Sequence, residues 1–183
     1  MKKKGFILVI LSVFCCLSLL HGADNQRPEI KVNLIIDGSG AFVGVKEEIT
    51  AWVSGRLDQI LAEGDMVTIW NAGTAARVVY SGRINSASDK DAVKKSIGDI
   101  TAAGNNADFS GALREASQQQ GSGLNYTLLI SASPAAISSL LSGPQANLLR
   151  FSRMEEFSGW RALVVGLNLD EKVRKAAANF IGS

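Results

Sequence analysis

The chain has 183 residues, a length for which one folded domain is expected. Its formal net charge is +2, but three of its 19 basic residues are the lysines at positions 2–4. Without these lysines, 16 basic residues stand against 17 acidic ones. A net charge of about −1 with no basic cluster argues against a nucleic-acid partner.

The amino-terminal segment has the order of parts of a secretory signal peptide. The lysines precede an uncharged apolar run at 5–20, and Ala23 supplies a small residue for cleavage. The run is shorter than the ~20 residues of a membrane-spanning helix. We therefore expect removal of 1–23, with 24–183 forming one exported domain, periplasmic or secreted. A retained membrane anchor and lipidation of a cysteine in the run stay open as alternatives.

The only histidine, His21, and both cysteines, Cys15 and Cys16, lie in that segment. The remaining chain then has no side chain for a disulfide, a Cys/His zinc site, a cysteine nucleophile or a Ser-His-Asp triad. We therefore expect a binding protein and not an enzyme.

Hydrophobic periodicity predicts strands that alternate with helices. Strands are expected at 30–36, 66–70, 77–80 with an extension toward 84, 126–130 and 161–167. Helices are expected at 45–62, 89–100, 109–119 and 170–181, with two helical pieces between 135 and 157.

The second and third strands are separated by only a few residues, which forces an antiparallel hairpin. The other strands are joined by crossover helices, as in a parallel sheet covered on both faces. The prediction is an α/β fold, Rossmann-like and three-layered (α/β/α), with a mostly parallel sheet and one antiparallel edge strand. Ligands of such sheets bind beyond the carboxyl ends of the strands, here at 37–42, 104–110 and 131–134.

Three segments stand out at the ends of predicted strands or before a predicted helix: LIIDGSGA at 34–41, NADFSGAL at 106–113 and LLISA at 128–132. They resemble parts of von Willebrand factor type A (vWA) domains. LIIDGSGA at 34–41 resembles the opening strand and metal-site loop of that family, and NADFSGAL at 106–113 resembles its second metal loop and third helix. LLISA at 128–132 resembles its fourth strand and third loop. The order of elements agrees over about 30–181. The resemblance implies a vWA fold and a module that binds a protein partner.

In that family the three loops form a metal-ion-dependent adhesion site (MIDAS) that usually holds Mg²⁺. Its pattern is Asp-x-Ser-x-Ser in the first loop, Thr in the second and Asp in the third. In this chain Asp37 and Ser39 occupy the first two positions, whereas the others hold Ala41, Ala107 and Ala132. Alanine offers no oxygen to a hard cation. The resemblance therefore implies a degenerate site without a cofactor.

Alternatives remain for these residues. A register slip of one residue would place Ser131 or Ser133 at the third-loop position, and a weak Mg²⁺ site on Asp37, Ser39 and Asp108 stays open. Asp37 and Ser39 would otherwise cap the turn and the first helix through backbone N–H groups. A dinucleotide site is not expected, since Val43 stands where the Rossmann fingerprint needs glycine.

We expect the partner to contact the loops above the sheet. Phe42 is the apolar side chain in these loops, and it would either anchor a partner or staple the first helix. A structural role in an envelope complex is the alternative to partner recognition. The candidate binding residues are Asp37, Gly38, Ser39, Gly40, Phe42, Asp108 and Ser131.

Overall fold

The computed structural model of the chain describes residues 29–119, 124–143, 146–147 and 160–166. The predicted signal peptide at 1–23 and the predicted last helix at 170–181 lie outside these ranges, as does most of the predicted helical region between 144 and 157. None of the helices in the described ranges is both long and apolar enough to cross a membrane.

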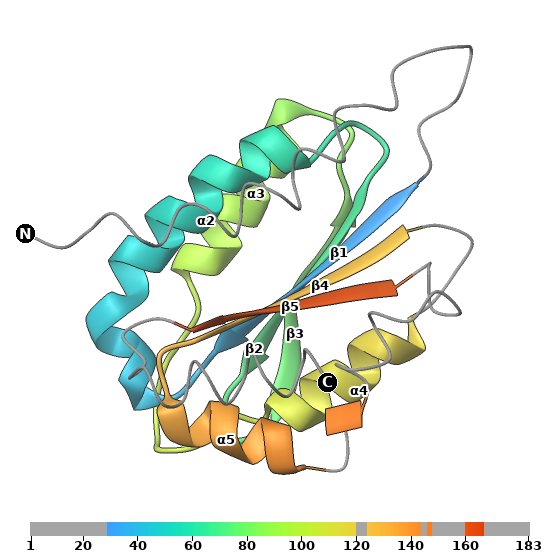
Figure 1. The fold of residues 1–183 in the computed structure, drawn as a ribbon. Coiled ribbons are helices and arrows are strands. Elements are labelled where there is room, and N and C mark those ends of the chain that lie inside the picture. Colours follow the sequence, from blue (N-terminus) through green and yellow to red (C-terminus); the bar gives the residue numbers. More distant parts are fainter. Residues whose placement is uncertain (1–28, 120–123, 144–145, 148–159, 167–183) are drawn as a thin grey trace, which may run out of the picture.

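In the described part of the chain, five strands form one sheet in the order β3-β2-β1-β4-β5 (Figure 1). β1 (Ile30–Asp37) is central and pairs in parallel with β2 (Met66–Ala72) and β4 (Leu124–Ser131), and β4 pairs in parallel with β5 (Trp160–Gly166). β3 (Ala76–Arg83) is antiparallel to β2 at one edge. The predicted fold class, with its antiparallel edge strand, is confirmed.

Helices cover both faces of the sheet (Figure 1). α2 (Lys46–Ile60), preceded by the 3₁₀ helix η1 (Gly40–Val45), and α3 (Ala87–Gly98) pack on one face. α4 (Phe109–Gln118) and α5 (Pro134–Ser142) pack on the other. The two faces have separate apolar cores, as a three-layer fold requires.

Local sequence explains how three of the helices begin. In α4, Asp108 is the N-cap, and its carboxylate accepts a hydrogen bond from Gly111 N at 2.8 Å. In α5, Ser133 caps the helix and Pro134 opens it. Before α3, the Asp89 carboxylate accepts hydrogen bonds from Asn85 N and the Ser86 hydroxyl, and both hydrogen bonds lower the pKa of Asp89.

β2 is longer than its predicted range. The strand was expected to end at residue 70, but it continues to Ala72, because Asn71 and Ala72 stay paired with Ile36 and Asp37 of the central strand. The composition Asn-Ala-Gly favours a turn, but the ladder to β1 extends the strand to Ala72. This extension places the Asn71 side chain beside the first loop.

Candidate binding edge

The loops at the carboxyl ends of β1 and β2 are tied together by backbone hydrogen bonds. Gly38 N donates to Ala72 O at 2.8 Å, and Ala103 N donates to Gly38 O at 2.8 Å. Gly40 N donates to Gly104 O at 2.7 Å. We call this surface the loop edge and define it as residues 38–44, 73–77, 101–108 and 131–133. The predicted convergence of three loops is therefore present.

Asp37 is completely buried, and its carboxylate joins the first loop to the third. Oδ1 accepts a hydrogen bond from Ser39 N at 2.8 Å. Oδ2 accepts hydrogen bonds from Ser131 Oγ at 2.7 Å and from Ala132 N at 3.2 Å. Three donors compensate the burial of this charge, which would otherwise be costly. Asp37 thus caps the turn, as one of the two predicted roles requires, and Ser131 serves the same junction.

Ser39 does not cap η1 with its side chain, so the predicted capping role of Ser39 is wrong. The residue is buried, and its Oγ has no hydrogen-bond partner among the described residues. The Asp37 carboxylate meets the backbone N–H of Ser39 instead. A buried hydroxyl left this way costs about 1–3 kcal/mol.

Asp108 directs its carboxylate toward the protein. Oδ1 accepts from Gly111 N at 2.8 Å and Oδ2 from Ala76 N at 3.2 Å, while its own N donates to Gly73 O at 2.9 Å. A Cβ on Gly111 would lie 2.3 Å from Asp108 Oδ2, so a larger residue there would displace this carboxylate. Asp108 therefore joins α4 to the β2–β3 hairpin and does not present a free carboxylate.

Phe42 cannot anchor a partner, because it is 0% exposed and packs in the core below α2. Of the two roles expected for Phe42, the partner anchor is therefore wrong. Its neighbour Val43 is 62% exposed and is the apolar side chain that the first loop presents. The sequence does not indicate which of these two adjacent apolar residues is buried, because the orientation of η1 determines it.

Sequence reasoning also missed the contact between Gly38 and Asn71. A Cβ on Gly38 would lie 1.9 Å from Asn71 Oδ1 and 2.9 Å from the backbone of Gly73. Asn71 is buried, and its Nδ2 donates to Thr101 O at 3.0 Å, which fixes the amide. The only available signal was a polar residue at the end of an otherwise buried strand.

A hollow of ≈ 340 Å³ opens beside this contact. Among the described residues, Arg77 is the only ionisable side chain that lines it, and it forms no ion pair with another of them. The lining residues are Gly38, Asn71, Gly73, Thr74, Ala75, Arg77, Thr101 and Ala103.

The side chains at the loop edge do not fit a Mg²⁺ site of the family's kind. The alanines at 41, 107 and 132 supply no side-chain oxygen, and both carboxylates accept hydrogen bonds from protein donors. Within the described ranges, no group of three His, Cys, Asp or Glu residues is placed to hold a metal ion. One carboxylate and one hydroxyl, on Asp37 and Ser39, are the remaining oxygens at family positions.

Neither a protein-family model nor a curated protein sequence matches this chain. Several solved structures are similar to it. The chain is similar to von Willebrand factor type A from Catenulispora acidiphila, with 17% identity and a TM-score of 0.51 over 86% of this chain and 42% of that one. It is also similar to the ArnB paralog VWA2 from Sulfolobus acidocaldarius, with 15% identity and a TM-score of 0.51 over 87% and 41% of the two chains.

Proximal thread matrix protein 1 from the mussel byssus matches with 12% identity and a TM-score of 0.53, over 76% of this chain and 36% of that one. A second structure of that protein has a zinc-occupied MIDAS motif. The chain thus spans 36–42% of the length of these proteins. Identities this low show the fold alone. Together with the mixed five-stranded sheet between two helical layers, they show that the chain has the fold of a von Willebrand factor type A domain.

Proposed function

We propose that this chain is an exported vWA-like module that binds a protein partner at the loop edge without Mg²⁺, and that it is not an enzyme. The observation that carries the proposal is the Asp37 carboxylate, which is buried and accepts three hydrogen bonds from the protein. At the family's metal position, this carboxylate stabilises the loops.

The surface of the loop edge suits contact with a protein. Its exposed residues are mainly small and uncharged, so a partner can approach the backbone closely at little desolvation cost. Val43 supplies an apolar contact, and Arg77 supplies a charge beside the hollow. These exposed residues include Gly40, Ala41, Val43, Gly44, Thr74, Ala75, Thr101, Ala103 and Gly104.

Two further parts of the proposal rest on other grounds. Export is supported by the order of basic, apolar and small residues at 2–23. A binding role is favoured over catalysis because the described residues that line the hollow beside Gly38 include no His, Cys, Asp or Glu to act as nucleophile or base. A structural role in an envelope complex predicts that the purified protein forms a stable higher oligomer, which size-exclusion chromatography detects.

A matched pair of exposed valines tests the binding surface. We expect Val43→Asp to reduce capture of the partner from the cell envelope at least tenfold, because it places a charge in the contact, while Val78→Asp leaves capture unchanged. Val78 is 45% exposed and lies on β3, so both variants add one charge at an exposed apolar position. Quantitative affinity purification with each variant measures the ratio. Equal capture by Val43→Asp and wild type would place the contact elsewhere.

A Mg²⁺-dependent module is the second candidate, and it is favoured by one observation, the buried Ser39 Oγ without a partner. Thermal melts in Mg²⁺, Mn²⁺ and EDTA separate the two candidates. We expect the same melting temperature in all three solutions, because a ligand stabilises a protein only when it binds the native state. An increase in Mg²⁺ that Ser39→Ala abolishes would support the metal-dependent candidate and exclude our proposal.

A further inference from the structure

The sheet face below α4 is apolar at one end and polar at the other. Toward the loop edge, Ile35 and Trp70 pack under the helix. Toward the opposite end, the same face holds the register neighbours Asn33, Thr68 and Thr127, all buried. Strands in the middle of a parallel sheet are usually apolar on both faces, and a buried polar group costs about 1–3 kcal/mol unless it is hydrogen-bonded. This polar end therefore requires an explanation.

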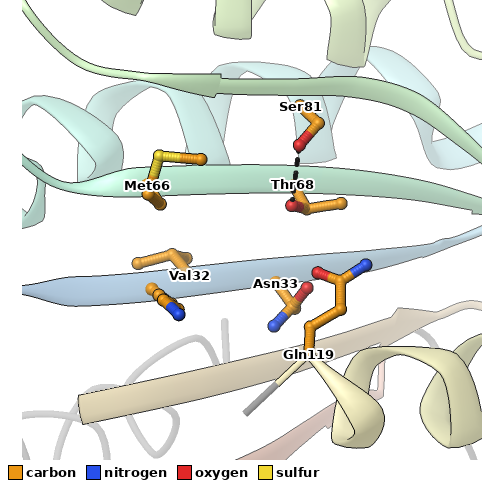
Figure 2. A pocket seen from close by; sticks show the side chains of 7 residues that line it. Val32, Asn33, Met66, Thr68, Ser81 and Gln119 are labelled. Atoms are coloured by element: carbon orange, nitrogen blue, oxygen red, sulfur yellow. Dashed lines mark hydrogen bonds between the residues drawn. The ribbon is translucent and has the colours of Figure 1, made fainter. Parts of the chain in front are cut away.

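Hydrogen bonds satisfy part of this polar cluster. Asn33 Nδ2 donates to Asn125 Oδ1 at 2.9 Å, and Asn33 Oδ1 accepts from Trp70 Nε1 at 3.2 Å. The hydroxyls of Thr68 and Ser81 lie 3.2 Å apart (Figure 2). Asn125 Nδ2 is buried and has no partner among the described residues. Among the described residues, the cluster thus retains one unused donor.

A hollow of ≈ 150 Å³ opens on this cluster. Its only ionisable lining residue in the described part of the chain is the half-buried Lys31, which forms no ion pair or hydrogen bond with another described residue. Glu29, two residues earlier, pairs with Arg83 at 2.9 Å. The lining residues, most of which Figure 2 labels, are Lys31, Val32, Asn33, Met66, Thr68, Ser81 and Gln119.

We propose that this hollow binds a short-chain carboxylate. Its described lining residues offer one cation, two hydroxyls and two side-chain amides but no acidic group, so an anion that accepts hydrogen bonds complements them. Met66 provides an apolar wall for a short hydrocarbon chain. Drug-sized ligands need about 300–1,000 Å³. A hollow of ≈ 150 Å³ therefore limits the ligand to a few non-hydrogen atoms.

This site is separate from the loop edge. Lys31 lies near the amino end of β1, whereas Asp37 lies at its carboxyl end. The proposed carboxylate site therefore does not depend on the proposed function, and each can be tested without the other.

Butyrate titration followed by NMR tests the site. We expect butyrate at millimolar concentration to shift the side-chain amide signals of Asn33 and Gln119, and Lys31→Gln to weaken binding at least tenfold. Ser81→Ala, on the edge strand, should weaken it by a smaller factor. Lys95→Gln is the matched control, because it removes one positive charge from the exposed surface of α3 and should leave the affinity unchanged.

The neutral analogue butyramide provides the second control. Equal binding of butyramide and butyrate would show that the charge of Lys31 is not recognised, and the inference would be wrong. The same conclusion would follow if butyrate bound wild type and Lys31→Gln equally, provided that circular dichroism shows the variant folded, or if it shifted no signal near the hollow.

Discussion

Asp37→Ala is expected to destabilise the protein by about 3–5 kcal/mol in EDTA, because it leaves a buried hydrogen-bond network without its acceptor. The change leaves Ser39 N, Ser131 Oγ and Ala132 N without their acceptor. Each unpaired buried donor costs about 1–3 kcal/mol. Urea denaturation in EDTA measures the difference in the free energy of unfolding.

Asp37→Asn tests the same hydrogen bonds with a side chain of nearly the same size but no charge. The asparagine oxygen can accept a hydrogen bond either from Ser39 N or from the third loop, but the NH₂ group then faces the donor on the other side. We therefore expect a loss of about 2 kcal/mol, smaller than that of alanine. Asp91→Asn, at an exposed position on α3, is the control and should stay within about 0.5 kcal/mol of wild type.

The free energy of unfolding in EDTA distinguishes two roles of Asp37, binding a cation and holding the loops together. A carboxylate retained mainly to bind a cation contributes little, or is unfavourable, when the cation is removed, because an unpaired buried charge is costly. A carboxylate that holds the loops contributes fully in EDTA. If Asp37→Ala were as stable as wild type in EDTA but less stable in Mg²⁺, the structural role proposed here would be wrong.

The elements with strong local patterns could be predicted from the sequence. Phe109, Ala112, Leu113 and Ala116 recur at helical spacing, and all are buried in α4. The apolar run of β1 indicated a strand buried on both faces, and Asp37 at its end was expected at the binding edge. The short connection between β2 and β3 required the antiparallel hairpin.

The details that depend on distant residues could not be predicted. Phe42 and Val43 are adjacent apolar residues, and only the core below α2 determines which is buried. The Asn33–Asn125 hydrogen bond joins residues 92 positions apart. The local sequence around Asp108 is compatible with two roles, binding a cation or capping a helix. The positions of Gly111 and Ala76 N decide for the cap.

Gly38→Ala is expected to destabilise the protein by about 1–3 kcal/mol and to impair partner binding, although the substitution adds a single methyl group. That methyl would lie 1.9 Å from Asn71 Oδ1 and 2.9 Å from Gly73 N. Asn71 cannot withdraw freely, because its Nδ2 is held by Thr101 O at 3.0 Å. The loop, the hairpin and the hollow between them must therefore shift together.

Gly44→Ala is the matched control for this prediction. A Cβ on Gly44 would meet nothing within 4 Å, so we expect a change in the free energy of unfolding within about 0.5 kcal/mol. The two substitutions have the same chemistry and lie six residues apart in one loop. Thermal and urea unfolding of both variants, with partner capture, separate a steric effect at Gly38 from a general effect of alanine in the loop.

A double variant identifies the atoms responsible. Asn71→Ala removes the nearest clash, so combining it with Gly38→Ala should cost less than the sum of the two single changes, by at least 0.5 kcal/mol in a double-mutant cycle. Rescue should be incomplete, because the backbone of Gly73 remains 2.9 Å from the new methyl group. Additive costs would mean that Gly38 and Asn71 do not constrain each other, and the steric contact inferred between them would be wrong.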